Sequence, residues 1–258
     1  MMQTTRIIAI RHGETAWNVT TRIQGQLDIS LNERGRWQAA QLAQALAQEP
    51  LAAIYASDLT RAWQTAQAVA AHQTVTITPE IGLRERGFGE FEGRTFAEIE
   101  AELPEQALRW RSRDPTFSPA GGETLVALRE RVLEAVARLA ARHPGELIAL
   151  VGHGGVMDVL YRAATRQAID APRTWALGNA TINRLLWTPE GFTLVGWSDT
   201  QHLEGEALDD NRFADIPPAR GPGARLAPVH ETQLPAANDA CAAQDAVRVA
   251  TSHTLPSP

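Results

Sequence analysis

The chain has 258 residues, enough for one large domain or two small ones, and its 44% hydrophobic and 21% charged content is ordinary for a globular protein. A formal net charge of -6 argues against a broad nucleic-acid-binding surface, which needs a basic footprint. The single cysteine, Cys241, excludes an intramolecular disulfide and a cysteine-rich metal site, and the lack of any lysine excludes Schiff-base chemistry on that residue.

Strand-like and helix-like segments alternate along most of the chain. Apolar runs and helical periodicity predict, in chain order, a strand at 7–10, a helix at 33–48, a strand at 51–57, a helix from a cap at Ser57 or Asp58 to about His72, a strand at 75–78, shorter helices within 94–112 interrupted at Pro104, a helix at 124–142, a strand at 147–151, a helix at 155–166 and a hairpin of 181–187 with 192–197. This alternation favours an α/β domain with a largely parallel sheet that is covered on both faces.

The character of the sequence changes at about residue 209. Prolines crowd the last fifty residues, no aromatic residue follows Phe213, and no apolar periodicity is present. Such a segment cannot bury enough apolar surface to offset the entropy lost on ordering. We therefore expect an ordered domain over 1–208 and a disordered Pro/Ala-rich tail over 209–258.

Two of the seven histidines share one sequence context. His12 lies in RHGET directly after the apolar run IIAI, and His153 lies in GHGG directly after LIALV. A glycine follows each histidine. Because ligands of parallel sheets bind beyond the carboxyl ends of the strands, we expect the two histidines to share one site there.

The residues around the two histidines favour an anion. Arg11 precedes His12, and Arg61 stands in the first turn of the helix after YAS. The glycines open room for backbone N–H groups to face a negative group. Phosphate suits this set better than a carboxylate does. We expect no metal, since a cation would lie among cations and no HExxH spacing is present.

These residues resemble the histidine phosphatase superfamily, whose fold is called phosphoglycerate mutase-like. The resemblance spans about residues 5–200, and its motifs occur in order: RHGETAWN (11–18), RIQGQLDISLNERGRWQA (22–39), YASDLTRAWQTA (55–66), LRERGFGEFEG (83–93), GGET (121–124) and LVGHGG (150–155). It implies an α/β three-layer sandwich with a mainly parallel sheet, formed by a histidine phosphatase domain over 1–208. The tail lies outside it.

The resemblance also implies a mechanism without a metal or cofactor. Neutral His12 attacks phosphorus, and Arg11, Arg61 and His153 hold the phosphoryl oxygens. Three glutamates, Glu85, Glu90 and Glu92, are candidates for the group that protonates the leaving oxygen and later activates water; family position selects Glu85. The implied substrate-binding residues are Arg11, Asn18, Gln24, Arg61, His153 and Gly154. Thr15, Ser57 and Thr65 also fit motif positions, although local caps and backbone hydrogen bonds explain them equally well.

The same constellation fits more than one function. A phosphomonoesterase is favoured over a phosphoglycerate mutase-type transferase, because only a short, mainly helical stretch joins Gly93 to Gly122 where dedicated mutases resemble one another in a long insert. Within it, WRSR at 110–113 is either a substrate contact or a solvated turn. A weakly catalytic phospho-ligand binding protein is the third alternative, and the intact set of His12, Glu85 and His153 argues against it.

We expect a small phosphorylated metabolite as the substrate. Sugar phosphates, phosphoglycerates and a cobamide precursor phosphate are all compatible, and a homodimer is left open. No run approaches the roughly 18 apolar residues of a membrane span, and the N-terminal apolar run is shorter than the ~7–15 residues of a signal peptide. We therefore expect a cytoplasmic protein that binds neither membrane nor nucleic acid.

Overall fold

The structure is a computed structural model that describes residues 3–206. The predicted tail and its boundary at 208 lie outside the described residues. The strands are β1 (Thr5–Arg11), β2 (Leu51–Ala56), β3 (Ile77–Pro79), β4 (Leu147–Gly152), β5 (Ile182–Thr188) and β6 (Gly191–Asp199). The α-helices are α1 (Ala16–Val19), α2 (Glu33–Ala45), α3 (Thr60–Ala70), α4 (Phe96–Glu102), α5 (Pro104–Arg111), α6 (Leu125–Ala140) and α7 (Gly154–Thr165), and the 3-10 helices are η1 (Ile81–Leu83), η2 (Gly89–Phe91) and η3 (Gln201–Glu206).

The strands form one sheet in the order β3-β2-β4-β1-β5-β6. The first four of these run parallel to their neighbours, whereas β5 and β6 are antiparallel. The central strands β1 and β4 are apolar on both sides, as expected for strands covered on both faces. The predicted mainly parallel sheet is confirmed.

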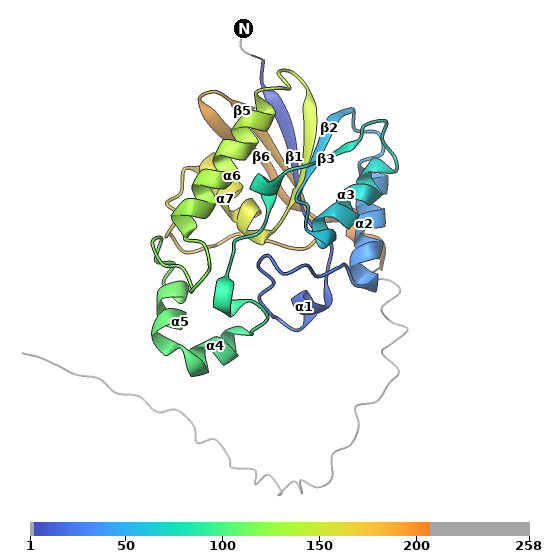
Figure 1. Cartoon of the computed structure of the whole chain (residues 1–258). Helices are drawn as coiled ribbons and strands as arrows, with labels where there is room; N and C mark the ends of the chain where they lie inside the picture. Colours follow the sequence, from blue (N-terminus) through green and yellow to red (C-terminus); the bar gives the residue numbers. More distant parts are fainter. Residues whose placement is uncertain (1–2, 207–258) are drawn as a thin grey trace, which may run out of the picture. The chain divides into compact units, whose positions relative to one another are not determined.

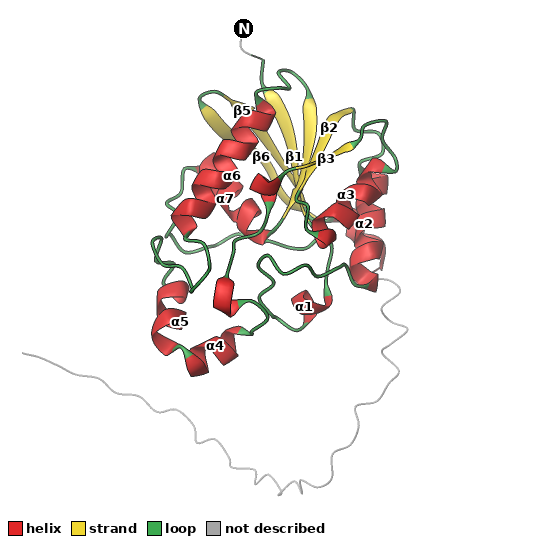
Figure 2. Cartoon of the chain, in the orientation of Figure 1, coloured by secondary structure: helices red, strands yellow, loops and turns green. Residues whose placement is uncertain are grey.

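Helices cover both faces of the sheet (Figures 1 and 2). On one face, α6 and α7 pack their apolar sides on alternate residues of β1 and β4, with Val136, Leu160 and Ile148 in the same core. On the other face, α2 and α3 pack on the residues between them, with Leu42, Ala66 and others. Because successive side chains of a strand point to opposite faces, one strand serves both cores. The three-layer α/β sandwich is confirmed.

The start of α3 differs from the expectation. The helix begins at Thr60 with Leu59 as its N-cap and without a side-chain cap, so the predicted capping by Ser57 or Asp58 is wrong. Asp58 is engaged elsewhere, since its carboxylate accepts two hydrogen bonds from Arg84 at 2.7 and 2.5 Å. The carboxylate of Asp28 instead accepts the N–H and the hydroxyl of Thr60, both at 2.7 Å.

Three neighbouring strands end at the same edge of the sheet. The N–H of His12, after β1, donates to the carbonyl of Gly152 in β4 at 3.0 Å. The N–H of Ser57, after β2, donates to the carbonyl of Val151 at 2.9 Å, and His153 follows β4 directly. The topology thus brings His12, His153 and Ser57 together, as the shared context of the two histidines predicted.

The loop after β1 lies against the first turn of α2. A Cβ placed on Gly35 would lie only 2.0 Å from the carbonyl oxygen of Glu14. Asn32 caps α2 by accepting the N–H of Gly35 at 2.7 Å, and its amide donates to the Glu14 carboxylate at 2.8 Å. Only glycine leaves room for this contact, which holds the loop that follows His12.

Replacing Gly35 with alanine should therefore destabilise the protein by about 1–3 kcal/mol, because the clash is with backbone. Helix propensity alone predicts the opposite sign, a gain of up to about 1 kcal/mol. Urea unfolding measures the change, with Arg34→Ala on the exposed side of the same turn as the control. A Gly35→Ala protein as stable as the control would contradict the close approach.

Candidate active site

His12 and His153 are the centre of the site. Their rings lie 5.2 Å apart between centroids, and their exposed fractions are 3% and 0%. The two histidines thus lie close together, as predicted, and both are buried.

The imidazole of His12 is fixed in one orientation. Its Nδ1 lies 2.6 Å from the carbonyl oxygen of Gly13, which can only accept, so Nδ1 carries the proton and Nε2 keeps its lone pair. Burial, followed by the charges of Arg61 and Arg11, holds the pKa of His12 well below its ordinary value. His12 is therefore a neutral imidazole with a free Nε2.

His153 lies in hydrogen-bonding contact with Ser57. The sequence alone leaves open whether Ser57 belongs to the site or only caps the local backbone. The Ser57 hydroxyl accepts the N–H of Leu59 at 3.3 Å and lies 2.8 Å from Nε2 of His153. Burial, followed by Arg61 and the neighbouring His12, keeps the pKa of His153 well below its ordinary value. When the Ser57 hydroxyl donates to Nε2, the neutral ring carries its proton on Nδ1. This Nδ1 has no partner among the described residues.

Two guanidiniums lie beside the histidines and are oriented by carbonyl oxygens. Arg61, 0% exposed, donates to the carbonyls of Leu27 and Gly25 at 2.8 and 2.7 Å. Arg11 donates to the carbonyl of Leu177. Burial lowers the pKa of both arginines, but a guanidinium stays charged at physiological pH. The Nε atom of each is buried without a partner in the described part of the chain.

Glu85 is the one of the three candidate glutamates that lies against these groups. Its carboxylate accepts the N–H of Gly155, at the start of α7, with both oxygens at 3.0 and 3.1 Å. Glu90 instead accepts the N–H of Ala120, and Glu92 accepts the backbone N–H groups of Gln26 and Phe88. A Cβ on Gly154 would lie 3.7 Å from both Glu85 Oε2 and Arg11 Nε, so these groups converge around Gly154.

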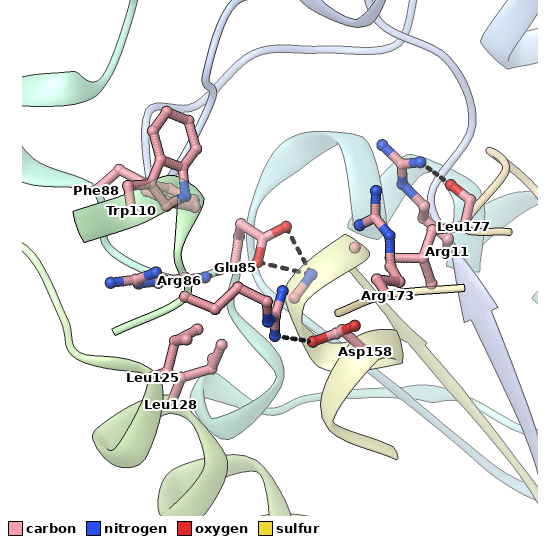
Figure 3. A pocket seen from close by; sticks show the side chains of 13 residues that line it. Arg11, Glu85, Arg86, Phe88, Trp110, Leu125, Leu128, Asp158, Arg173 and Leu177 are labelled. Carbon is pink, nitrogen blue, oxygen red and sulfur yellow. Dashed lines mark hydrogen bonds and ion pairs between the residues drawn. The ribbon is translucent and has the colours of Figure 1, made fainter. Parts of the chain in front are cut away.

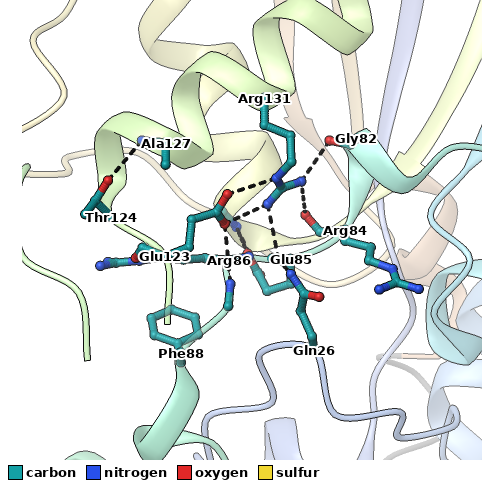
Figure 4. A network of polar contacts seen from close by, with 12 residues as sticks. Gln26, Gly82, Arg84, Glu85, Arg86, Phe88, Glu123, Thr124, Ala127 and Arg131 are labelled. Carbon is teal, nitrogen blue, oxygen red and sulfur yellow. Dashed lines mark hydrogen bonds and ion pairs between the residues drawn. The ribbon is translucent and has the colours of Figure 1, made fainter. Parts of the chain in front are cut away.

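Arg131 of α6 fixes the segment that carries Glu85 (Figure 4). Its guanidinium donates to the carbonyls of Gly82 and Arg84, both at 3.0 Å, and pairs with Glu123 at 2.8 Å. These hydrogen bonds tie the residues directly before Glu85 to helix α6. The position of Glu85 therefore depends on α6 as well as on α7.

The remaining predicted residues lie around this centre. Asn18 accepts the N–H and hydroxyl of Thr15, both at 3.0 Å, in the capping box of α1, which leaves its amide N–H₂ to donate. Gln24 is buried with Oε1 unpartnered among the described residues. Thr65 accepts the N–H of Gly13 at 3.1 Å and donates to the Arg61 carbonyl at 2.8 Å. Thr15 thus caps α1, and Thr65 joins α3 to the backbone directly after His12.

A chamber of about 380 Å³ opens beside Glu85 (Figure 3). Its lining residues are Arg11, Glu85, Arg86, Phe88, Trp110, Arg113, Leu125, Leu128, Gly154, Gly155, Asp158, Arg173 and Leu177. The WRSR segment is divided: Trp110 and Arg113 line the chamber, whereas Arg111 pairs with Glu100 and lies over the ring of Phe96. One part of this segment thus lies at the chamber and another at the surface, and substrate contact by Trp110 and Arg113 stays a prediction.

Sequence reasoning missed several residues of the site. Asn179 donates to the carbonyl of His12 at 3.0 Å and to that of Gly13 at 3.4 Å. Asp158 and Arg173 line the chamber from α7 and the loop after it. The loop residues stand outside any periodic segment and any quoted motif, so no sequence signal marked them.

Within residues 3–206, no group of three or more histidine, cysteine or carboxylate side chains is placed to hold a metal ion. Nor does any helix in that range combine the length and apolar character needed to cross a bilayer. The groups that can meet a substrate's negative charge here are guanidiniums, imidazoles and N–H groups.

Comparison with known proteins agrees with this geometry. The sequence profile of the histidine phosphatase superfamily (branch 1) matches residues 7–200. Phosphoglycerate mutase-like protein 4 of Arabidopsis thaliana is 37% identical over 202 residues, covering 77% of this chain and 86% of that protein. The metal-independent phosphoserine phosphatase of the same plant is 36% identical over 207 residues, covering 78% and 84%.

A solved structure is similar to this chain over the same part of the sequence. The native structure of mycobacterial glucosyl-3-phosphoglycerate phosphatase superposes with a TM-score of 0.70 at 33% identity, covering 77% of this chain and all of that one. The chain belongs to the histidine phosphatase superfamily. Its phosphoglycerate mutase-like fold is confirmed, and relatives named as phosphatases support its assignment as a phosphoric monoester hydrolase.

Proposed function

We propose that the protein hydrolyses phosphomonoesters of small metabolites through a phosphohistidine on His12. The observation that carries the proposal is the neutral, oriented imidazole of His12, buried between two guanidiniums whose charge no carboxylate within the described chain cancels at ion-pair distance. A nucleophile and an anion site are thus combined in one place.

In the first step, Nε2 of His12 attacks phosphorus in line with the leaving oxygen. The N–P bond forms, the P–O bond to the leaving group breaks, and the leaving alkoxide takes a proton from the Glu85 carboxyl. Arg11, Arg61 and Nδ1–H of His153 donate to the non-bridging oxygens as their charge redistributes. The unpartnered nitrogens of these three residues supply those donors.

In the second step, water replaces the product alcohol. Glu85, now ionised, takes a proton from that water while the water oxygen attacks phosphorus. The P–N bond breaks, its electron pair returns to Nε2 of His12, and inorganic phosphate leaves. Asn18 and Gln24 would add neutral hydrogen bonds to the phosphoryl group without adding charge.

The substrate is a small molecule. A chamber of about 380 Å³ is at the small end of ligand pockets, which span roughly 300–1,000 Å³. The phosphatases that this chain is similar to are named for phosphoserine and glucosyl-3-phosphoglycerate. Phosphorylated metabolites of this size are therefore the first to assay, with mutase turnover of phosphoglycerate measured in parallel.

His12→Ala should abolish turnover, because no neighbouring side chain can replace the nucleophile. Wild-type protein quenched during turnover at alkaline pH should carry phosphate on His12, detected by peptide mass spectrometry. Arg34→Ala serves as the matched control and should be phosphorylated normally. A His12→Ala protein that kept a tenth of the wild-type activity would exclude the covalent mechanism.

Glu85→Gln should slow turnover by on the order of 10²–10⁴ for alkyl phosphates, since it removes the proton donor. The loss should be much smaller for p-nitrophenyl phosphate, whose leaving group needs little protonation. Steady-state kinetics on both substrates measure the difference. Equal losses for good and poor leaving groups would reject Glu85 as the acid.

A further inference from the structure

The lining of the chamber beside Glu85 contains more arginines than carboxylates. Four arginines line the whole chamber, Arg11, Arg86, Arg113 and Arg173, against the two carboxylates of Glu85 and Asp158. Arg11 belongs to the phosphate site described above. The other three cations are more than the transferred phosphoryl group requires, and the mechanism gives none of them a role.

Arg173 is the clearest case. It lies in the loop after α7, exposed at the chamber, and makes no hydrogen bond or ion pair with another described residue. Its guanidinium lies beside that of Arg11 (Figure 3), and its charge contributes to the lowered pKa of Arg11. Two like charges side by side repel each other until an anion binds between or beside them.

Arg113 adds a second cation, whose Nε and Nη2 donate to the carbonyl of Ile169 at 3.2 and 3.1 Å. Its Nη2 donates to Asp158 Oδ2 at 2.7 Å, but Nε of Arg162 reaches the same oxygen at 2.9 Å from within α7. Two guanidiniums thus share one carboxylate, and the group of three carries a net positive charge. Arg113 comes from the turn after α5, so its ion pair with Asp158 joins that turn to α7.

We propose that Arg173 and Arg113 form a subsite for a second anionic group on the leaving group of the substrate. The proposal rests on the proposed function and narrows its substrate class to phosphomonoesters that also carry a carboxylate or a further phosphate. The paired N–H donors of a guanidinium suit both groups. Arg11 and Arg61 hold the transferred phosphoryl group, while Arg173 and Arg113 select what is attached to it.

The test compares matched substrates in the wild-type protein and in Arg173→Gln. One pair, 3-phosphoglycerate and glycerol 3-phosphate, differs by a carboxylate; a second, fructose 1,6-bisphosphate and fructose 6-phosphate, differs by a phosphate. In at least one pair, the wild type should have a higher kcat/KM for the member that carries the additional anionic group. Arg173→Gln should reduce that preference by about 10- to 100-fold, the effect of one charge-assisted hydrogen bond.

The pair that shows the preference identifies the group, carboxylate or phosphate. Equal kcat/KM within both pairs in the wild type would overturn the proposal. So would an Arg173→Gln protein that loses the same factor on both members of the preferred pair, because Arg173 would then act on the transferred phosphoryl group. Arg34→Gln, an equal loss of charge on the exposed face of α2, should leave the preference unchanged.

Hydrolysis of p-nitrophenyl phosphate by the wild type separates this proposal from the function on which it rests. If the wild type hydrolyses that ester but shows no preference in either pair, the second anion subsite is wrong and the phosphatase mechanism stands. If it hydrolyses neither p-nitrophenyl phosphate nor any member of the two pairs, the proposed function fails, and the subsite fails with it.

Discussion

Burying His12 beside two guanidiniums forces its imidazole to stay uncharged, and the remaining site is built around that constraint. A proton on Nε2 would place a third cation beside two guanidiniums in a largely buried position, so the lone pair stays available. The carbonyl of Gly13 decides which nitrogen keeps the proton. Carbonyl partners orient Arg61 and Arg11 without cancelling their charge, so the positive potential remains for the substrate.

The fold meets this constraint by dividing the work between strands and helices. The ends of β1, β4 and β2 deliver His12, His153 and Ser57 at one edge of the sheet, where backbone hydrogen bonds between neighbouring strands set their spacing. Helix α7 begins at the same edge and offers the Gly155 N–H to Glu85. Glu85 therefore lies on a loop, which the start of α7 and Arg131 hold through hydrogen bonds.

Much of this could be predicted from the sequence, for identifiable reasons. The two strand–His–Gly junctions predicted that His12 and His153 lie close together, because parallel strands end at a common edge. Glu85 could be chosen among three glutamates only through family position, since spacing does not separate them. The cap of α3 was predicted wrongly because Asp58 pairs with Arg84, a partner 26 residues away. Arg173 and Asn179 gave no signal, since loop residues reach the site through tertiary contacts that no local pattern encodes.

The protonation state of His12 is the central claim, and nitrogen-15 NMR of histidine-labelled protein tests it most directly. The signals are assigned by comparison with a His12→Asn variant. From about pH 7.5 down to about pH 5.5, Nδ1 should stay protonated and Nε2 should keep the shift of an unprotonated nitrogen, below the ordinary histidine midpoint of about 6.5. A His12 ring that titrates near that midpoint, or one that carries its proton on Nε2, would contradict the account.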